Sequence, residues 1–150
     1  MNTPNKVSVT GRVKIFMNGE LIRDITNLVV TAGHGFIASR MGSASDTVMT
    51  HMAIGTGTTA AVIADTTLET ESTRQALAVS GGTVSTNTVT YERTFAADDP
   101  DVTAPAVAAI TEAGLFNDAT TGTMLARTVF PVINKGETDV MTISWVVTIS

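Results

Sequence analysis

Apolar and polar residues alternate along the first part of the chain, between residues 6 and 15. Valine and isoleucine occupy one set of alternate positions, whereas serine, threonine, arginine and lysine occupy the other. Successive side chains of a β-strand point to opposite faces, so this pattern predicts a strand with one buried and one solvated face. Asn18 and Gly19 follow, and both tolerate the positive φ of a tight hairpin turn. We therefore predict an opening β-hairpin whose second strand covers residues 21–25.

Residues 31–41 depart from this alternation and predict a helix. Ala32, Phe36, Ile37 and Arg40 recur at spacings of three to four positions, as on one side of a helix that has Thr31 as its N-cap. Two glycines inside this segment each cost about 1 kcal/mol relative to alanine. The prediction is therefore one short helix.

The alternation returns after the helix and is clearest near the C-terminus, where the odd-numbered positions from 141 to 149 are all apolar. Trp145 is one of them, so the only tryptophan is expected in the core. Connections rich in glycine, threonine and aspartate separate the apolar segments. Further strands are predicted at residues 48–54, 74–79, 84–95, 107–116, 124–130 and 139–149.

β-Branched residues dominate the chain, because threonine and valine together make up about 29% of it. Such side chains fit a pleated, half-buried surface better than a helix. Strands that recur without intervening helices are typical of antiparallel folds. We predict a mainly β protein: a single-domain antiparallel β-sandwich, jelly-roll-like, with one short α-helix near residues 31–41. The domain is expected at residues 6–150, after a flexible N-terminal arm at residues 1–5.

The composition excludes several functional classes. The net charge is −5, which disfavours binding to the phosphate backbone of a nucleic acid. The chain has no cysteine, which excludes disulfides and thiolate chemistry. No segment has the roughly 18 apolar residues of a membrane span or the apolar stretch of a signal peptide. We therefore expect a soluble protein made in the cytoplasm, with no nucleic-acid or membrane partner.

Two polar segments look superficially like ligand sites. The sequence GTGTTA at 55–60 matches the glycine pattern of a dinucleotide-binding turn, but the residues after it are too few and too rich in threonine for the required helix. A loop that needs positive φ explains it better. Asp98, Asp99 and Asp101 offer oxygen ligands for Ca²⁺, without the glycine turn and distal glutamate of a dedicated site. A solvated acidic loop explains them better, and we predict no cofactor and no metal.

A Ser-His-Asp or zinc arrangement would have to be built on His34 or His51, the only two imidazoles of the chain. Neither has a supporting motif, because the sequence contains no nucleophile elbow and no HExxH. We predict no catalytic residue and a protein that is not an enzyme.

Glu112 is a charged residue inside the apolar segment AITEAGLF at 109–116. Folding the chain back through the polar residues 117–122 places Arg127 almost opposite it. A charge in a half-buried strand needs a partner, so we predict a cross-strand pair between Glu112 and Arg127. The alternative is that Glu112 reaches a neighbouring subunit.

Seven segments follow one another in the chain: TNLVVTAGHGFIASRM at 26–41, HMAIGTGTTA at 51–60, DTTLETE at 65–71, VTYERTF at 89–95, ITEAGLFN at 110–117, GTMLARTVFP at 122–131 and ISWVVTIS at 143–150. Their order resembles that of small β-rich virion proteins of tailed bacteriophages. Members of this group are described as capsid decoration or cement proteins, as tail fibre proteins, or as phage structural proteins.

The resemblance implies a non-enzymatic role in the virion, assembled in the host cytoplasm. The first hypothesis is a capsid decoration protein that binds the major capsid protein as a homo-oligomer, with a trimer favoured over a dimer. In this hypothesis the N-terminal arm orders on a neighbouring capsid subunit; a frayed terminus is the alternative. The second hypothesis is a tail fibre or baseplate component bound to tail proteins. A carbohydrate-binding module is more remote, because only 5% of the residues are aromatic.

Overall fold

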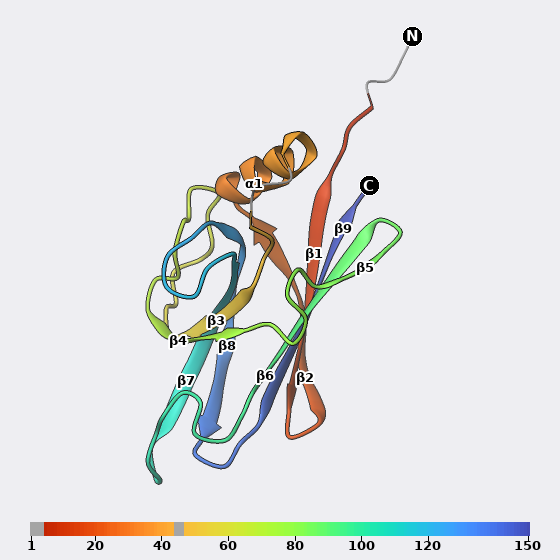
Figure 1. The fold of residues 1–150 in the computed structure, drawn as a ribbon. Helices are drawn as coiled ribbons and strands as arrows, with labels where there is room; N and C mark the ends of the chain where they lie inside the picture. Colours follow the sequence, from red (N-terminus) through yellow and green to blue (C-terminus); the bar gives the residue numbers. More distant parts are fainter. Residues whose placement is uncertain (1–4, 44–46) are drawn as a thin grey trace.

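The computed structural model describes residues 5–43 and 47–150, which form nine β-strands and one α-helix (Figure 1). Within these ranges, no helix is long and apolar enough to cross a membrane. Residues 1–4 of the predicted arm lie outside the described residues, and Asn5 is exposed. The helix is α1 (Thr31–Gly42), and the strands are β1 (Val9–Met17), β2 (Glu20–Val29), β3 (His51–Gly55), β4 (Glu71–Ala76), β5 (Thr83–Ser85), β6 (Thr88–Phe95), β7 (Val107–Phe116), β8 (Met124–Gly136) and β9 (Met141–Ile149).

All neighbouring strands are antiparallel, and the sheet folds over because β2 belongs to two layers. The part of β2 from Glu20 to Asn27 pairs with β1, whereas only Leu28 and Val29 pair with β8. The β9 layer therefore consists of β2, β1, β9, β6 and β5, and the β7 layer consists of β8, β7, β3 and β4 (Figure 1). The predicted mainly β antiparallel sandwich with one short helix is confirmed.

The main core lies between the two layers. Trp145 and Phe95 enter it from the β9 layer, and Met52 and Leu115 enter it from the β7 layer. The predicted burial of Trp145 is confirmed, and its indole Nε1 donates a hydrogen bond of 3.0 Å to Oδ1 of Asn27. The polar tip of the largest core side chain is therefore paired, as burial requires.

Most predicted strands are present with shifted ends. The strand predicted at 107–116 is confirmed as β7. The segment predicted as one strand at 84–95 is instead the β5–β6 hairpin, with Thr86 at a φ of 53° in its turn. Strand β8 runs past Pro131 to Gly136. Pro131 has no partner in the β2–β8 register or, because of an irregularity there, in the β7–β8 register, so its missing N–H breaks no ladder bond.

Helix α1 confirms the predicted helix and extends it by one residue, to Gly42. The prediction of Thr31 as N-cap is wrong, because Val30 occupies that position and no side chain caps the helix. The amide of Thr31 donates instead to the carbonyl of Ile63, at 2.8 Å, in the loop between β3 and β4. Gly33 lies directly against the carbonyl oxygen of Leu125 in β8, where a β-carbon would collide.

This contact makes Gly33→Ala destabilising. We expect a loss of about 1 to 3 kcal/mol in the free energy of unfolding, because the new methyl group pushes α1 off β8. Gly35→Ala is the matched control: a β-carbon there meets no atom within 4 Å, so it should stabilise by about 0.5 to 1 kcal/mol. Urea denaturation of both variants measures the difference, and equal effects would contradict the close contact.

Burial also affects Tyr91, the only tyrosine, and raises its pKa from 10.0 to about 12. Because the pKa is higher in the folded state, stability that is fully present below pH 10 is lost as the pH rises towards 12. Tyrosinate absorbance should therefore titrate at a clearly higher pH in buffer than in urea. Tyr91→Phe should lack this part of the pH dependence, and a native midpoint near 10 would refute the burial.

Candidate functional site: a polar cleft beside a buried ion-pair network

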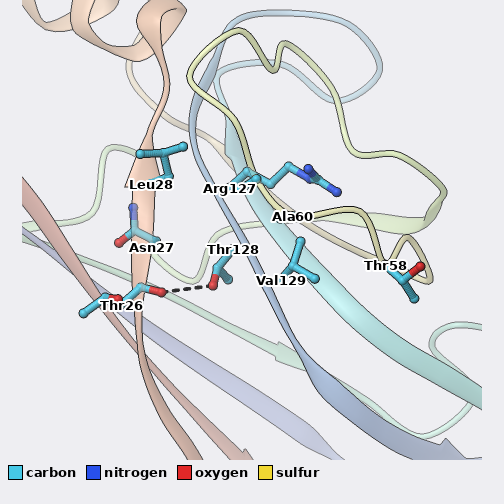
Figure 2. A pocket seen from close by; sticks show the side chains of 9 residues that line it. Thr26, Asn27, Leu28, Thr58, Ala60, Arg127, Thr128 and Val129 are labelled. Atoms are coloured by element: carbon cyan, nitrogen blue, oxygen red, sulfur yellow. Dashed lines mark hydrogen bonds between the residues drawn. The ribbon is translucent and has the colours of Figure 1, made fainter.

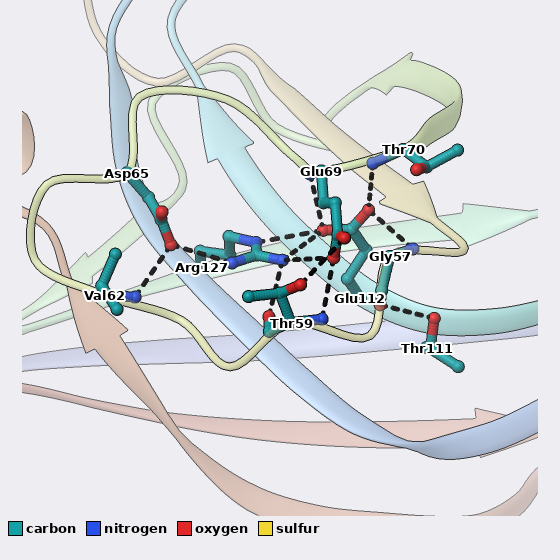
Figure 3. A network of polar contacts seen from close by, with 9 residues as sticks. All are labelled: Gly57, Thr59, Val62, Asp65, Glu69, Thr70, Thr111, Glu112 and Arg127. Atoms are coloured by element: carbon teal, nitrogen blue, oxygen red, sulfur yellow. Dashed lines mark hydrogen bonds and ion pairs between the residues drawn. The ribbon is translucent and has the colours of Figure 1, made fainter.

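The predicted pair of Glu112 and Arg127 is confirmed. Nε and Nη2 of Arg127 donate to Oε2 of Glu112 at 3.0 and 2.9 Å. In the β7–β8 register Glu112 lies opposite Val129 and Arg127 opposite Gly114, so the two charged residues are diagonal neighbours. Both side chains are buried on the face of the β7 layer that points away from the main core, under the loop of residues 56–70 between β3 and β4 (Figure 3).

The Glu112 carboxylate also binds the backbone of the 56–70 loop. The amides of Gly57 and Thr70 donate to Oε1 at 3.0 and 2.8 Å, and the amide of Glu69 donates to Oε2 at 3.0 Å. With the two bonds from Arg127, this fully buried carboxylate accepts five hydrogen bonds from its own chain. We call this arrangement the carboxylate clamp. The clamp holds both ends of the loop against β7. Glu112 therefore binds groups of its own chain, not the neighbouring subunit that the alternative prediction required.

Arg127 holds the middle of the same loop. Its Nη1 donates to Oδ2 of Asp65 at 2.8 Å, and its Nη2 donates to the carbonyl of Thr59 at 3.0 Å (Figure 3). Burial alone would lower the pKa of Arg127, but the hydrogen bonds and charges of Asp65 and Glu112 outweigh burial and raise it. The guanidinium therefore stays charged, and its donors are used within the chain. Glu69 adds a further contact by accepting from Thr59, whose amide lowers the pKa of that carboxyl group.

The glycines of the GTGTTA segment have a reason that the sequence analysis did not identify. Neither Gly55 nor Gly57 has a positive φ, so the expectation of such a turn is wrong. A β-carbon on Gly57 would come within 2.5 Å of the Glu112 carboxylate, and one on Gly55 would collide with the carbonyl of Thr70. The missing side chains therefore let the backbone approach a carboxylate of the same chain.

A cleft of about 410 Å³ opens beside the clamp, where β2 and β8 diverge (Figure 2). Thr128 Oγ1 donates to the carbonyl of Thr26 at 3.1 Å across its floor. Asn27 contributes an amide nitrogen, Nδ2, that is buried without a hydrogen-bond partner in the described chain. The lining residues are Thr26, Asn27, Leu28, Thr58, Ala60, Ala61, Arg127, Thr128 and Val129. Hydroxyl and amide groups make this cleft suited to hydrogen bonding.

The structure separates the two histidines. His34 is exposed on α1, and His51 begins β3 with its Nδ1 2.7 Å from the hydroxyl of Thr50. Asp98, Asp99 and Asp101 lie in the β6–β7 connection, and within the described residues no three acidic or imidazole side chains are placed to hold a metal ion.

One buried cation was missed by the sequence analysis. Lys135 in β8 is almost fully buried, and its Nζ donates to the carbonyl of Ala96 at 2.8 Å. Burial lowers its pKa, and the nearby carboxylates of Asp99, Asp139 and Asp98 only partly oppose this. The alternation that buries Ile133 two positions earlier could have predicted its burial.

Comparisons with known proteins find no relative: no family model matches the chain, and neither a curated protein nor a solved structure is significantly similar to it. The fold and the site therefore define only a class, an antiparallel β-sandwich with an internal carboxylate clamp.

The clamp predicts that Glu112→Gln strongly destabilises the protein. The change keeps the shape of the side chain but removes the fully buried one of the two carboxylates hydrogen-bonded to Arg127, so the free energy of unfolding should fall by about 3 to 5 kcal/mol. Asp24→Asn is the matched control, because the pair of Asp24 and Arg12 lies on the exposed surface and contributes little. Chemical denaturation compares the two, and equal losses would contradict the structural role of Glu112.

Proposed function

We propose that this protein is a non-enzymatic structural component of a bacteriophage virion, and specifically a capsid decoration protein that binds and stabilises the head lattice. The observation that carries the structural role is the carboxylate clamp. The two buried charged groups of the site, Glu112 and Arg127, hold a loop of the same chain in place. A rigid outer surface is what repeated docking to a lattice requires.

The resemblance to small phage virion proteins supports the same proposal through these residues. Four of the segments that carry it contain the parts of the clamp: HMAIGTGTTA holds Gly57, DTTLETE holds Glu69 and Thr70, ITEAGLFN holds Glu112, and GTMLARTVFP holds Arg127. The segments that carry the resemblance therefore include those that build the carboxylate clamp. The partner proposed here is the major capsid protein, bound by a homotrimer in preference to a dimer.

The burial of the aromatic residues gives less support to a carbohydrate-binding module. Five of the seven aromatic side chains are buried, and the other two, Phe16 and Phe36, are half-buried. Sugar-binding platforms need exposed aromatic rings.

Immunogold electron microscopy of intact particles of the phage that encodes this chain tests the proposal. We expect label over the heads, and we expect heads that lack the protein to lose their DNA at a lower temperature than complete heads. Adding the purified protein back should raise the temperature of DNA loss to that of complete heads. Label confined to tails would overturn the decoration role in favour of a tail component, and unlabelled particles would overturn the virion assignment.

A further inference from the structure

An apolar groove of about 280 Å³ separates α1 from the β9 layer at one end of the sandwich. Phe36 and Ile37 of α1 form one wall, and Val147 and Ile149 of β9 form the other. Both helix residues pack against the main core and are still only half-buried. The end of the core is therefore open to solvent here.

The same surface carries a protruding apolar side chain. Met41 lies in the last turn of α1 and lines the groove. Its exposed fraction, 87%, is the largest among the large apolar residues of the described chain. A protruding apolar side chain and an apolar groove thus lie side by side on one face. A surface of this kind is complementary to a second copy of itself, as association between identical subunits requires.

The composition of helix α1 also favours coverage of the groove. The helix contains three glycines in twelve residues, and Gly33 is its only buried residue. Such a helix gains stability from a further packing surface.

The distribution of charge favours a second copy. The chain carries a net charge of −5, so copies repel one another over most of their surface. Helix α1 contains no acidic residue and has Arg40 in its last turn. The acidic groups Asp98, Asp101, Glu137 and Asp139 belong to the β6–β7 and β8–β9 connections at the opposite end of the sandwich (Figure 1). Contact through the α1 end therefore keeps these charges apart.

We propose that the groove between α1 and the β9 layer is the homo-oligomer interface, in which Met41 of one copy enters the groove of another. This inference rests on the homo-oligomer of the proposed function and locates its contact surface. The interface is tested without phage particles, so its failure and that of the decoration role are distinguishable.

The test compares Met41→Arg with Val107→Arg in the full chain. Both positions are exposed and apolar, but Val107 begins β7 at the opposite end of the molecule. Analytical ultracentrifugation over a range of concentrations should show a wild-type oligomer. Met41→Arg should raise the dissociation constant at least tenfold and leave the circular dichroism spectrum unchanged, whereas Val107→Arg should associate like the wild type.

A labelling experiment covers the case in which Met41→Arg misfolds. The chain has no cysteine, so Met41→Cys and Val107→Cys each accept one environment-sensitive fluorophore. We expect a blue shift with rising concentration only for the label at position 41. A monomeric wild type, an oligomer that Met41→Arg leaves intact, or equal shifts at both positions would overturn the interface.

Discussion

The Glu112 carboxylate and the hydrogen bonds it accepts are the interaction on which the outer face of the β7 layer depends. Burying a charged pair is unfavourable unless each group is fully hydrogen-bonded, and here Arg127 and three amides of the 56–70 loop supply the donors. With the loop in place, Leu68 packs with Phe116 in a second apolar cluster outside the main core. The β7 layer is therefore covered on both faces.

The clamp also positions the α1 end of the molecule. The 56–70 loop includes Ile63, whose carbonyl accepts the first amide of α1, from Thr31. Gly33 then lets the helix lie against β8, which leaves Phe36 and Ile37 facing the β9 layer across the groove. A chain of contacts thus joins the buried carboxylate to the apolar surface proposed for self-association.

Part of the site could be predicted from sequence, and the reason is local. Glu112 is the one charge in an apolar strand, and a short polar connection brings Arg127 back beside it, so the pair follows from strand geometry. Its wider role could not be predicted, because Gly57 and Glu112 are 55 positions apart. The glycines were therefore attributed to turn conformation, although close approach of the carboxylate is what requires them.

The sequence by itself determined the mainly β class and most of the secondary structure, because alternation and helical spacing are properties of neighbouring residues. It placed β7 at its observed bounds and α1 to within one residue. Only the tertiary structure decided that β2 joins both layers, that one carboxylate fastens a distant loop, and that a groove stays open beside Met41. These features arise from contacts between residues far apart in the chain, which no local periodicity reports.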